Sequence, residues 1–135
     1  MALMTWDQKY SVGVKAIDSQ HSVLFGLIND LHGAMLKGEG KSMTGQLLEK
    51  LADYTQTHFV AEEKMMEAAS YPGLAQHRVK HRELIKKLEG YSARFKRGES
   101  TLNLHLMNFL RDWLTNHILE VDHEYSPCMK SRGIQ

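Results

Sequence analysis

Residues 56–85, which read QTHFVAEEKMMEAASYPGLAQHRVKHRELI, decide how this chain folds. A strong helix break, Ser70-Tyr71-Pro72-Gly73, divides the stretch into two segments. His58 and Glu62 precede the break, and His77 and His81 follow it, each pair spaced i,i+4. Residues four apart project from one face of a helix. The stretch therefore predicts two helices joined by a short turn, each with a pair of metal-ligating side chains on one face.

Outward from this stretch, two more breaks and a regular apolar period predict two further helices. The breaks are 37–41 (KGEGK) and 97–100 (RGES), and between them apolar residues recur every three or four positions. Helices joined by short turns pack as antiparallel neighbours. The predicted fold is all-α, an up-down-up-down antiparallel four-helix bundle in one domain, 1–135. Its expected parts are an N-terminal arm at 1–18, helices at about Ser19–Lys37, Ser42–Ala69, Leu74–Lys96 and Thr101–Asp122, and a C-terminal tail at 123–135.

Composition and charge exclude several classes of function. The 135 residues are 42% hydrophobic and 24% charged with a net charge of +1, and no run of Lys or Arg exceeds two residues. We therefore expect no binding to nucleic acid. No secretory signal is expected, because residues 1–10 lack both a basic flank and an apolar h-region. No membrane insertion is expected, because no apolar stretch approaches about 20 residues. Cys128 is the only cysteine, so no internal disulfide can form and a reducing, cytoplasmic setting is expected. The chain is expected to be a monomer, and Cys128 to be passive, with reversible oxidation or dimer cross-linking as the less favoured alternative.

The remaining candidate ligands occupy the same level of the predicted bundle. His21 is early in the first helix, and His117 and Asp122 are late in the fourth. In an up-down-up-down bundle those ends meet the end of the second helix and the start of the third, so all seven side chains converge at one end of the core. One pair fits poorly: His117 and Asp122 lie five residues apart, about 140° around an ideal helix. That spacing requires a local loosening of the last turn.

A count of donor atoms indicates the kind of metal centre. Two octahedral metals need twelve coordination positions. Five imidazoles fill five of them, two bridging carboxylates fill four, and one bridging solvent oxygen fills two. One position is left for an exogenous molecule. Nitrogen and oxygen ligands without sulfur favour iron, manganese or zinc and disfavour iron–sulfur clusters.

These motifs resemble those of the hemerythrin family over essentially the whole chain. The resemblance lies in His21, His58-x3-Glu62, His77-x3-His81 and His117-x4-Asp122, together with the strings 11–14 (SVGV), 17–21 (IDSQH), 58–63 (HFVAEE) and 113–118 (WLTNHI). The resemblance implies two non-haem iron ions bridged by an oxo or hydroxo group, which bind dioxygen reversibly.

The resemblance also assigns roles to the residues. His77, His81 and His117 would hold the saturated iron, His21 and His58 would hold the iron with the open position, and Glu62 and Asp122 would bridge the two. Leu24, Phe59 and Leu114 lie beside ligands and would line the dioxygen pocket; as ordinary core residues they would occupy the same places.

Other polar residues near the ligands receive simpler interpretations. Glu63 points about 100° away from Glu62 and is predicted to be solvated. His32 should be an interior or boundary residue outside the site, and both His105 and His123 should be exposed. Met65 and Met66 could border the pocket. Tyr125 could either donate a hydrogen bond toward the site or pack the final turn.

The favoured function is an oxygen carrier or store, not an enzyme, that delivers dioxygen to an oxygen-consuming enzyme. A di-iron oxidase or peroxidase is the first alternative, although such enzymes usually present four carboxylates and two histidines. A sensor of oxygen, nitric oxide or redox state is the second. Steady turnover of a reductant with dioxygen would favour the enzyme, and a protein partner that reads the conformation would favour the sensor.

Overall fold

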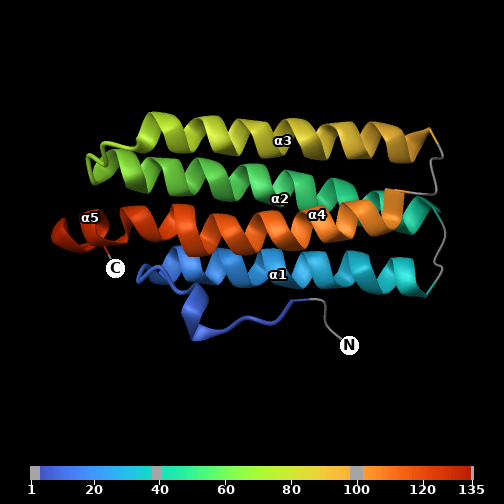
Figure 1. Ribbon diagram of the computed structural model, residues 1–135, viewed down its shortest axis with the longest axis horizontal. Coiled ribbons are helices and arrows are strands. Elements are labelled where there is room, and N and C mark those ends of the chain that lie inside the picture. The colour runs from blue at the N-terminus through green and yellow to red at the C-terminus, as the bar shows by residue number, and fades with distance from the viewer. Residues whose placement is uncertain (1–3, 38–40, 98–101, 135) are drawn as a thin grey trace.

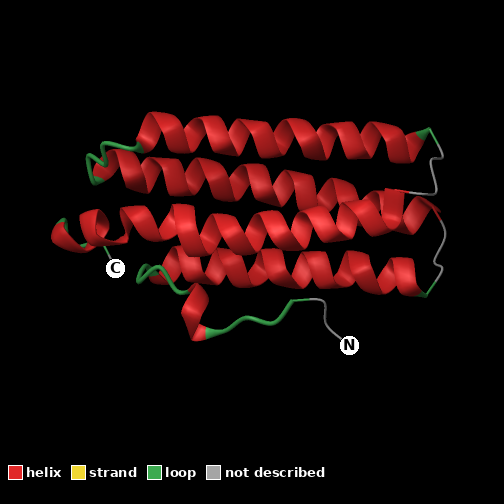
Figure 2. Ribbon diagram, in the orientation of Figure 1, coloured by secondary structure: helices red, strands yellow, loops and turns green. Residues whose placement is uncertain are grey.

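Four long helices lie side by side with nearly parallel axes (Figure 1). The computed structural model describes residues 4–37, 41–97 and 102–134, and within these ranges the only regular elements are helices (Figure 2). The helices are α1 (Lys15–Leu36), α2 (Lys41–Ala68), α3 (Leu74–Lys96) and α4 (Leu102–Asn116). The prediction of an all-α, up-down-up-down four-helix bundle is confirmed.

The first helix begins at Lys15, four residues earlier than the sequence suggested. The reason is Asp18, which we had placed in the arm. Its Oδ1 accepts a hydrogen bond from the Val12 amide at 2.9 Å, and its Oδ2 accepts one from the Ser11 hydroxyl at 2.6 Å. A carboxylate in the first turn also interacts favourably with the positive end of the helix dipole. Asp18 thus ties the end of the arm to the start of α1.

The N-terminal arm packs along α1 rather than leaving the bundle. The Met4 amide donates to Asn29 Oδ1 at 2.8 Å, and Asn29 Nδ2 donates back to the Met4 carbonyl at 2.7 Å. The Trp6 ring lies 5.8 Å from Tyr10 and 5.7 Å from Phe25, measured between ring centres. Farther along the arm, two apolar side chains join a small cluster that closes one end of the bundle, with members Val12, Val14, Ile17, Met66, Ala69, Tyr125 and Met129.

The C-terminal segment does not continue α4 as a regular helix. A π turn follows at His117–Val121, then a 3-10 turn at Asp122–Tyr125 and a short helix, α5 (Ser126–Ser131). Residues 123–131, which we expected to belong to a tail, are therefore helical and pack onto the end of the bundle. Cys128 is half-buried there, and its thiol lies 3.3 Å from the Ala69 carbonyl.

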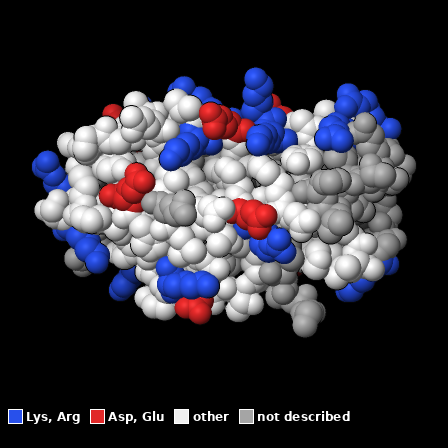
Figure 3. Space-filling model, in the orientation of Figure 1, with Lys and Arg blue, Asp and Glu red and all other residues white. Residues whose placement is uncertain are grey.

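None of the described helices is both long and apolar enough to span a bilayer. On the face shown in Figure 3, basic and acidic side chains are interspersed rather than gathered by sign.

Candidate metal centre

The seven predicted ligands meet at one end of the bundle. This is the end where α2 turns into α3, where α1 begins and where the π turn follows α4 (Figure 1). Every one of the seven side chains is buried, and none is more than 5% exposed. Their ligand atoms form two groups, with atoms no more than 4.8 Å apart within each group: Glu62, His77, His81, His117 and Asp122 in one, and His21, His58 and Glu62 in the other. The convergence expected from the helix levels is confirmed.

The π turn solves the spacing problem of His117 and Asp122. The Asp122 amide donates to the His117 carbonyl, an i to i−5 bond that brings residues five apart onto one face. As a result, His117 Nε2 lies 2.9 Å from Asp122 Oδ1. His123 Nδ1 donates to the Ile118 carbonyl at 2.6 Å, inside the same widened turn. The prediction that His123 is exposed was wrong: it is half-buried because it supports this turn.

The two carboxylates each present one oxygen to either group of histidines. Glu62 Oε1 lies 3.2 Å from His77 Nε2 and 3.0 Å from His81 Nε2. Asp122 Oδ1 lies 3.0 Å from His77 Nε2. On the other side, Glu62 Oε2 lies 3.6 Å from His21 Nε2 and 3.5 Å from His58 Nε2, and Asp122 Oδ2 lies 3.3 Å from His21 Nε2. Three histidines therefore surround one pair of oxygens and two surround the other pair.

Several of these buried atoms have no hydrogen-bond partner, although polar atoms lie close to them. The Nε2 atoms of His81 and His117 and both carboxylate oxygens of Asp122 are unpaired in this sense. Buried polar groups are almost always paired, so such a cluster needs an explanation. Lone pairs that converge on a common point fit a metal cation, and the donor set of nitrogen and oxygen suits iron, manganese or zinc. The residues present therefore fit the predicted metal ions.

Electrostatics point the same way. Burial lowers the pKa of His21, but the adjacent carboxylates of Asp122 and Glu62 outweigh this effect and raise the pKa to about 9. The same causes raise the pKa of His77 to about 9. The pKa values of Glu62 and Asp122 lie far below their usual range despite burial, because the histidines stabilise the carboxylates. When no metal is present, His21 and His77 therefore bind protons readily, which shows that the cluster favours positive charge.

A second layer of contacts holds the ligands in place. The Tyr125 hydroxyl, fully buried, donates to Glu62 Oε2 at 2.9 Å, which favours the first of the two roles considered for it. His58 Nδ1 is hydrogen-bonded to Gln20 Oε1 at 2.6 Å. Gln20 is part of the sequence motif 17–21, but the motif alone did not indicate this contact with His58. Its position one residue before His21 is the sequence feature that could have pointed to such a role.

Glu63 is not solvated as predicted. Its Oε2 lies 2.8 Å from His81 Nδ1, and its Oε1 accepts a hydrogen bond from Arg78 Nε at 3.0 Å. A direction 100° from Glu62 leads to the seam between α2 and α3 rather than to solvent, and the Glu63 side chain is only 21% exposed. The error came from treating α2 as if no neighbour covered that face.

Two aromatic rings stack on ligands. Phe59 lies parallel to His81, with ring centres 3.6 Å apart, and Trp113 lies nearly parallel to His117 at 4.3 Å. Trp113 lies four residues before His117, a spacing that places both side chains on one face of a helix. Met66 is fully buried and Met65 half-buried, both in the apolar cluster at the end of the bundle. His32 is half-buried and belongs to neither group of ligands, and the side chain of His105 lies outside the described residues.

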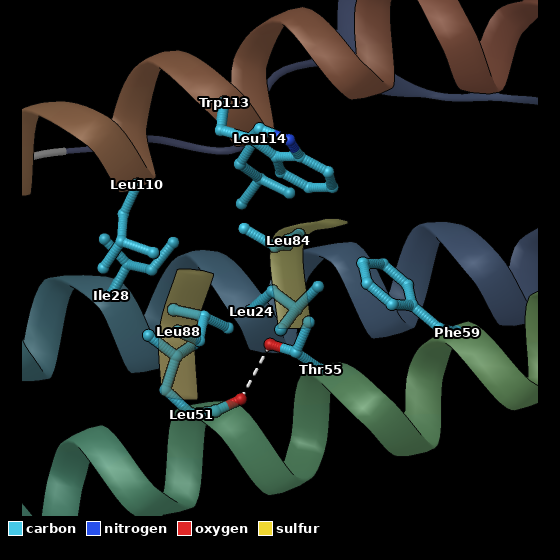
Figure 4. Close-up of a pocket in the computed structure, with 10 residues that line it drawn as sticks. All are labelled: Leu24, Ile28, Leu51, Thr55, Phe59, Leu84, Leu88, Leu110, Trp113 and Leu114. Carbon is cyan, nitrogen blue, oxygen red and sulfur yellow. Dashed lines mark hydrogen bonds between the residues drawn. The ribbon is translucent and has the colours of Figure 1, made fainter. Parts of the chain in front are cut away.

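An apolar cavity of about 20 Å³ lies in the bundle core, and several of its lining residues are one helical turn from the candidate ligands. The three predicted pocket residues, Leu24, Phe59 and Leu114, all line it (Figure 4). Two of the lining side chains carry a polar group, Thr55 and Trp113, and the Thr55 hydroxyl already donates to the Leu51 carbonyl at 2.7 Å. About 10–15 Å³ is enough for one water-sized molecule, so the cavity has room for one small molecule in a mainly apolar lining.

Comparisons with known proteins agree with this geometry. The profile of the hemerythrin HHE cation-binding domain matches residues 12–129. The chain belongs to the hemerythrin family. Its relatives include the bacteriohemerythrin of Methylococcus capsulatus, 36% identical over 97% of this chain and 100% of the relative. Myohemerythrin-1 of Phascolopsis gouldii is 32% identical over 89% of both chains. A crystal structure of wild-type hemerythrin superposes with a TM-score of 0.88 at 36% identity, covering 95% of this chain and 98% of that one.

Proposed function

We propose that this hemerythrin-family chain binds dioxygen reversibly at a non-haem di-iron centre and serves as an oxygen carrier or store. The observation that carries the proposal is the paired arrangement of the two buried carboxylates. Glu62 and Asp122 each direct one oxygen toward three histidines and the other oxygen toward the remaining histidines. Such an arrangement fits two metal ions bridged by both carboxylates, with an oxo or hydroxo group as the third bridge.

The two halves of the centre differ in the number of protein donors. His77, His81 and His117 would hold one iron, His21 and His58 would hold the other, and both would share Glu62 and Asp122. The half with two histidines has one protein donor fewer, so we place dioxygen binding there. When bound, a ferrous pair supplies the two electrons that reversible dioxygen binding requires.

The surrounding residues do the rest by excluding water. Leu24 lies one turn after His21, Leu114 one turn before His117, and Phe59 next to His58. All three are at most 5% exposed. The Thr55 hydroxyl is engaged by a backbone carbonyl, and the residues that line the cavity include no carboxyl group or histidine that could donate a proton to a bound molecule. An apolar pocket of this kind favours release of dioxygen over its reduction, which supports a carrier rather than an enzyme.

We place the protein in the cytoplasm as a monomer that delivers dioxygen to an oxygen-consuming enzyme. Its single cysteine is a free thiol, as is usual in reducing compartments. The described large apolar side chains that are exposed are Val23, Leu36, Val60 and Val79. They come from three different helices, whereas subunit interfaces are usually contiguous apolar patches.

Optical spectroscopy with metal analysis tests the proposal. Protein from iron-replete cells should contain two irons per chain and no haem. Its reduced form should gain a visible absorption band on exposure to dioxygen and lose it on degassing. One metal per chain, two zinc ions, or a spectrum that does not reverse would overturn the proposal. Sustained consumption of dioxygen with a reductant would replace it with the oxidase.

A further inference from the structure

Two of the ligands are held from behind by side chains of different charge. His81 Nδ1 donates to Glu63 Oε2 at 2.8 Å, and His58 Nδ1 donates to Gln20 Oε1 at 2.6 Å. Both hydrogen bonds place the imidazole proton on Nδ1 and leave Nε2 free to face the carboxylates of the centre. The partner is an anion for His81 and a neutral amide for His58, and the two histidines belong to opposite halves of the centre.

Glu63 is fixed in this position by its neighbours. Arg78 Nε donates to Glu63 Oε1 at 3.0 Å, which leaves Oε2 for His81. Arg78 also reaches Glu67, with Nη2 3.6 Å from Oε2. The His81 ring is only 2% exposed, and Phe59 stacks on its face. An exposed ion pair contributes little to stability. Here, however, Glu63 links Arg78 to the His81 ring, which is buried and therefore restricted in its motion.

A hydrogen bond to a carboxylate makes an imidazole a stronger electron donor than a hydrogen bond to a neutral amide, because negative charge on the acceptor draws the Nδ1 proton away. A stronger donor stabilises a metal in its higher oxidation state. We propose that Glu63 is a positioning residue that orients His81 and, together with Gln20 behind His58, makes the two halves of the metal centre electronically unequal. The half with three histidines would then be the easier one to oxidise. This inference rests on the function proposed above.

Exchanging the charges behind the two ligands tests the electronic part of the proposal. Glu63→Gln keeps the size and an acceptor for the His81 proton but removes the negative charge. Gln20→Glu adds a negative charge behind His58. Measured by redox titration of the iron-loaded protein, the reduction potential of the centre should rise in Glu63→Gln and fall in Gln20→Glu. A role limited to packing would not give shifts of opposite sign, so equal or same-sign shifts would overturn the proposal.

Loss of metal to a chelator tests the positioning part without any use of dioxygen binding. Glu63→Ala removes the acceptor, and its ferrous form should lose iron roughly 10- to 100-fold faster than the parent under anaerobic conditions. Glu63→Gln should restore a rate near that of the parent. Glu67→Gln is the matched control, because it removes the other carboxylate on Arg78 and does not contact His81.

The outcomes separate this inference from the proposed function. If the parent binds two irons and dioxygen but Glu63→Ala loses iron at the parental rate, the inference fails and the function stands. If Glu67→Gln loses iron as fast as Glu63→Ala, the effect comes from Arg78 and the inference also fails. If the parent takes up no iron, both fail together.

Discussion

Replacing Leu114 by Ala should weaken both the fold and the protection of bound dioxygen. Leu114 is 5% exposed and forms part of the wall of the apolar cavity, one turn before His117 (Figure 4). The change removes three carbons, a loss of about 2.4 kcal/mol at roughly 0.8 kcal/mol each. The substitution also enlarges a cavity that is already present beside Leu114, and the free energy cost of this empty volume adds to the loss of stability. We expect a total of about 3–4 kcal/mol, within the usual range for Leu to Ala.

The functional effect follows from the same cavity. In the parent it has room of about 20 Å³, enough for one small molecule. Enlarged beside His117, it would admit water to the metal ions. The dioxygen-loaded protein should therefore decay faster to an oxidised form that no longer binds dioxygen, with its iron content unchanged.

Leu88→Ala is the matched control for this experiment. Leu88 is 1% exposed and lines the same cavity, but it lies two turns beyond His81 on α3 and so is farther from the metal centre. Both variants should lose similar stability in denaturant unfolding of the iron-loaded protein. Only Leu114→Ala should show faster decay of the visible absorption band, followed at several pH values. If the two variants decay at the same rate, or both like the parent, then Leu114 is only a packing residue and the proposed pocket is wrong.

Three further predictions concern the ligands. Since the pKa values of His21 and His77 are raised to about 9, protons compete with metal below that pH. Zinc titration of metal-free protein should show an apparent affinity that rises from pH 6.5 to 9, with release of protons on binding. A zinc affinity that does not depend on pH would contradict this. Tyr125→Phe removes a buried hydrogen bond to charged Glu62 and should lower the free energy of unfolding by about 1.5–3 kcal/mol, measured by denaturant titration, and a change within error would mean that the bond contributes no net stability. His77→Ala should lower the iron content, whereas His58→Ala should chiefly impair dioxygen binding; the reverse pattern would exchange the roles of the two irons.

The convergence of the candidate ligands on α2 and α3 could be predicted from sequence because it depends on regular helix geometry and on the order of the helices. His58 with Glu62, and His77 with His81, share faces through i,i+4 spacing, and the antiparallel order of the helices sets their common level. Neither argument needs to know how side chains pack. The helix break before α3 was equally clear from the sequence, and α3 has the predicted bounds, Leu74–Lys96.

The partners of the ligands could not be predicted in the same way, because they depend on contacts between helices. Glu63 lies on α2, whereas the groups it binds, Arg78 and His81, lie on α3. A helical wheel for α2 places Glu63 off the core face, and only the position of α3 shows that this direction is an interhelical seam. The start of α1 was missed for a related reason. Asp18 reads as a residue before a helix, but its carboxylate bonds backward to Ser11 and Val12, so the helix continues past it toward the N-terminus.

The π turn after α4 shows why an irregular helix belongs at this place. Glu62 reaches both groups of histidines from a regular helix, since His58 precedes it by four residues. Asp122 must meet the same histidines from the end of α4, where its partner His117 is five residues away, and a regular helix would place the two about 140° apart around its axis. The i to i−5 bond from the Asp122 amide to the His117 carbonyl removes that discrepancy, and His123 satisfies the Ile118 carbonyl within the turn. A sequence with His and Asp four apart would have a more regular helix, but its carboxylate would sit one residue nearer to His117 along the axis. The helix is therefore irregular at this turn because only the wider turn brings the Asp122 carboxylate to the histidines.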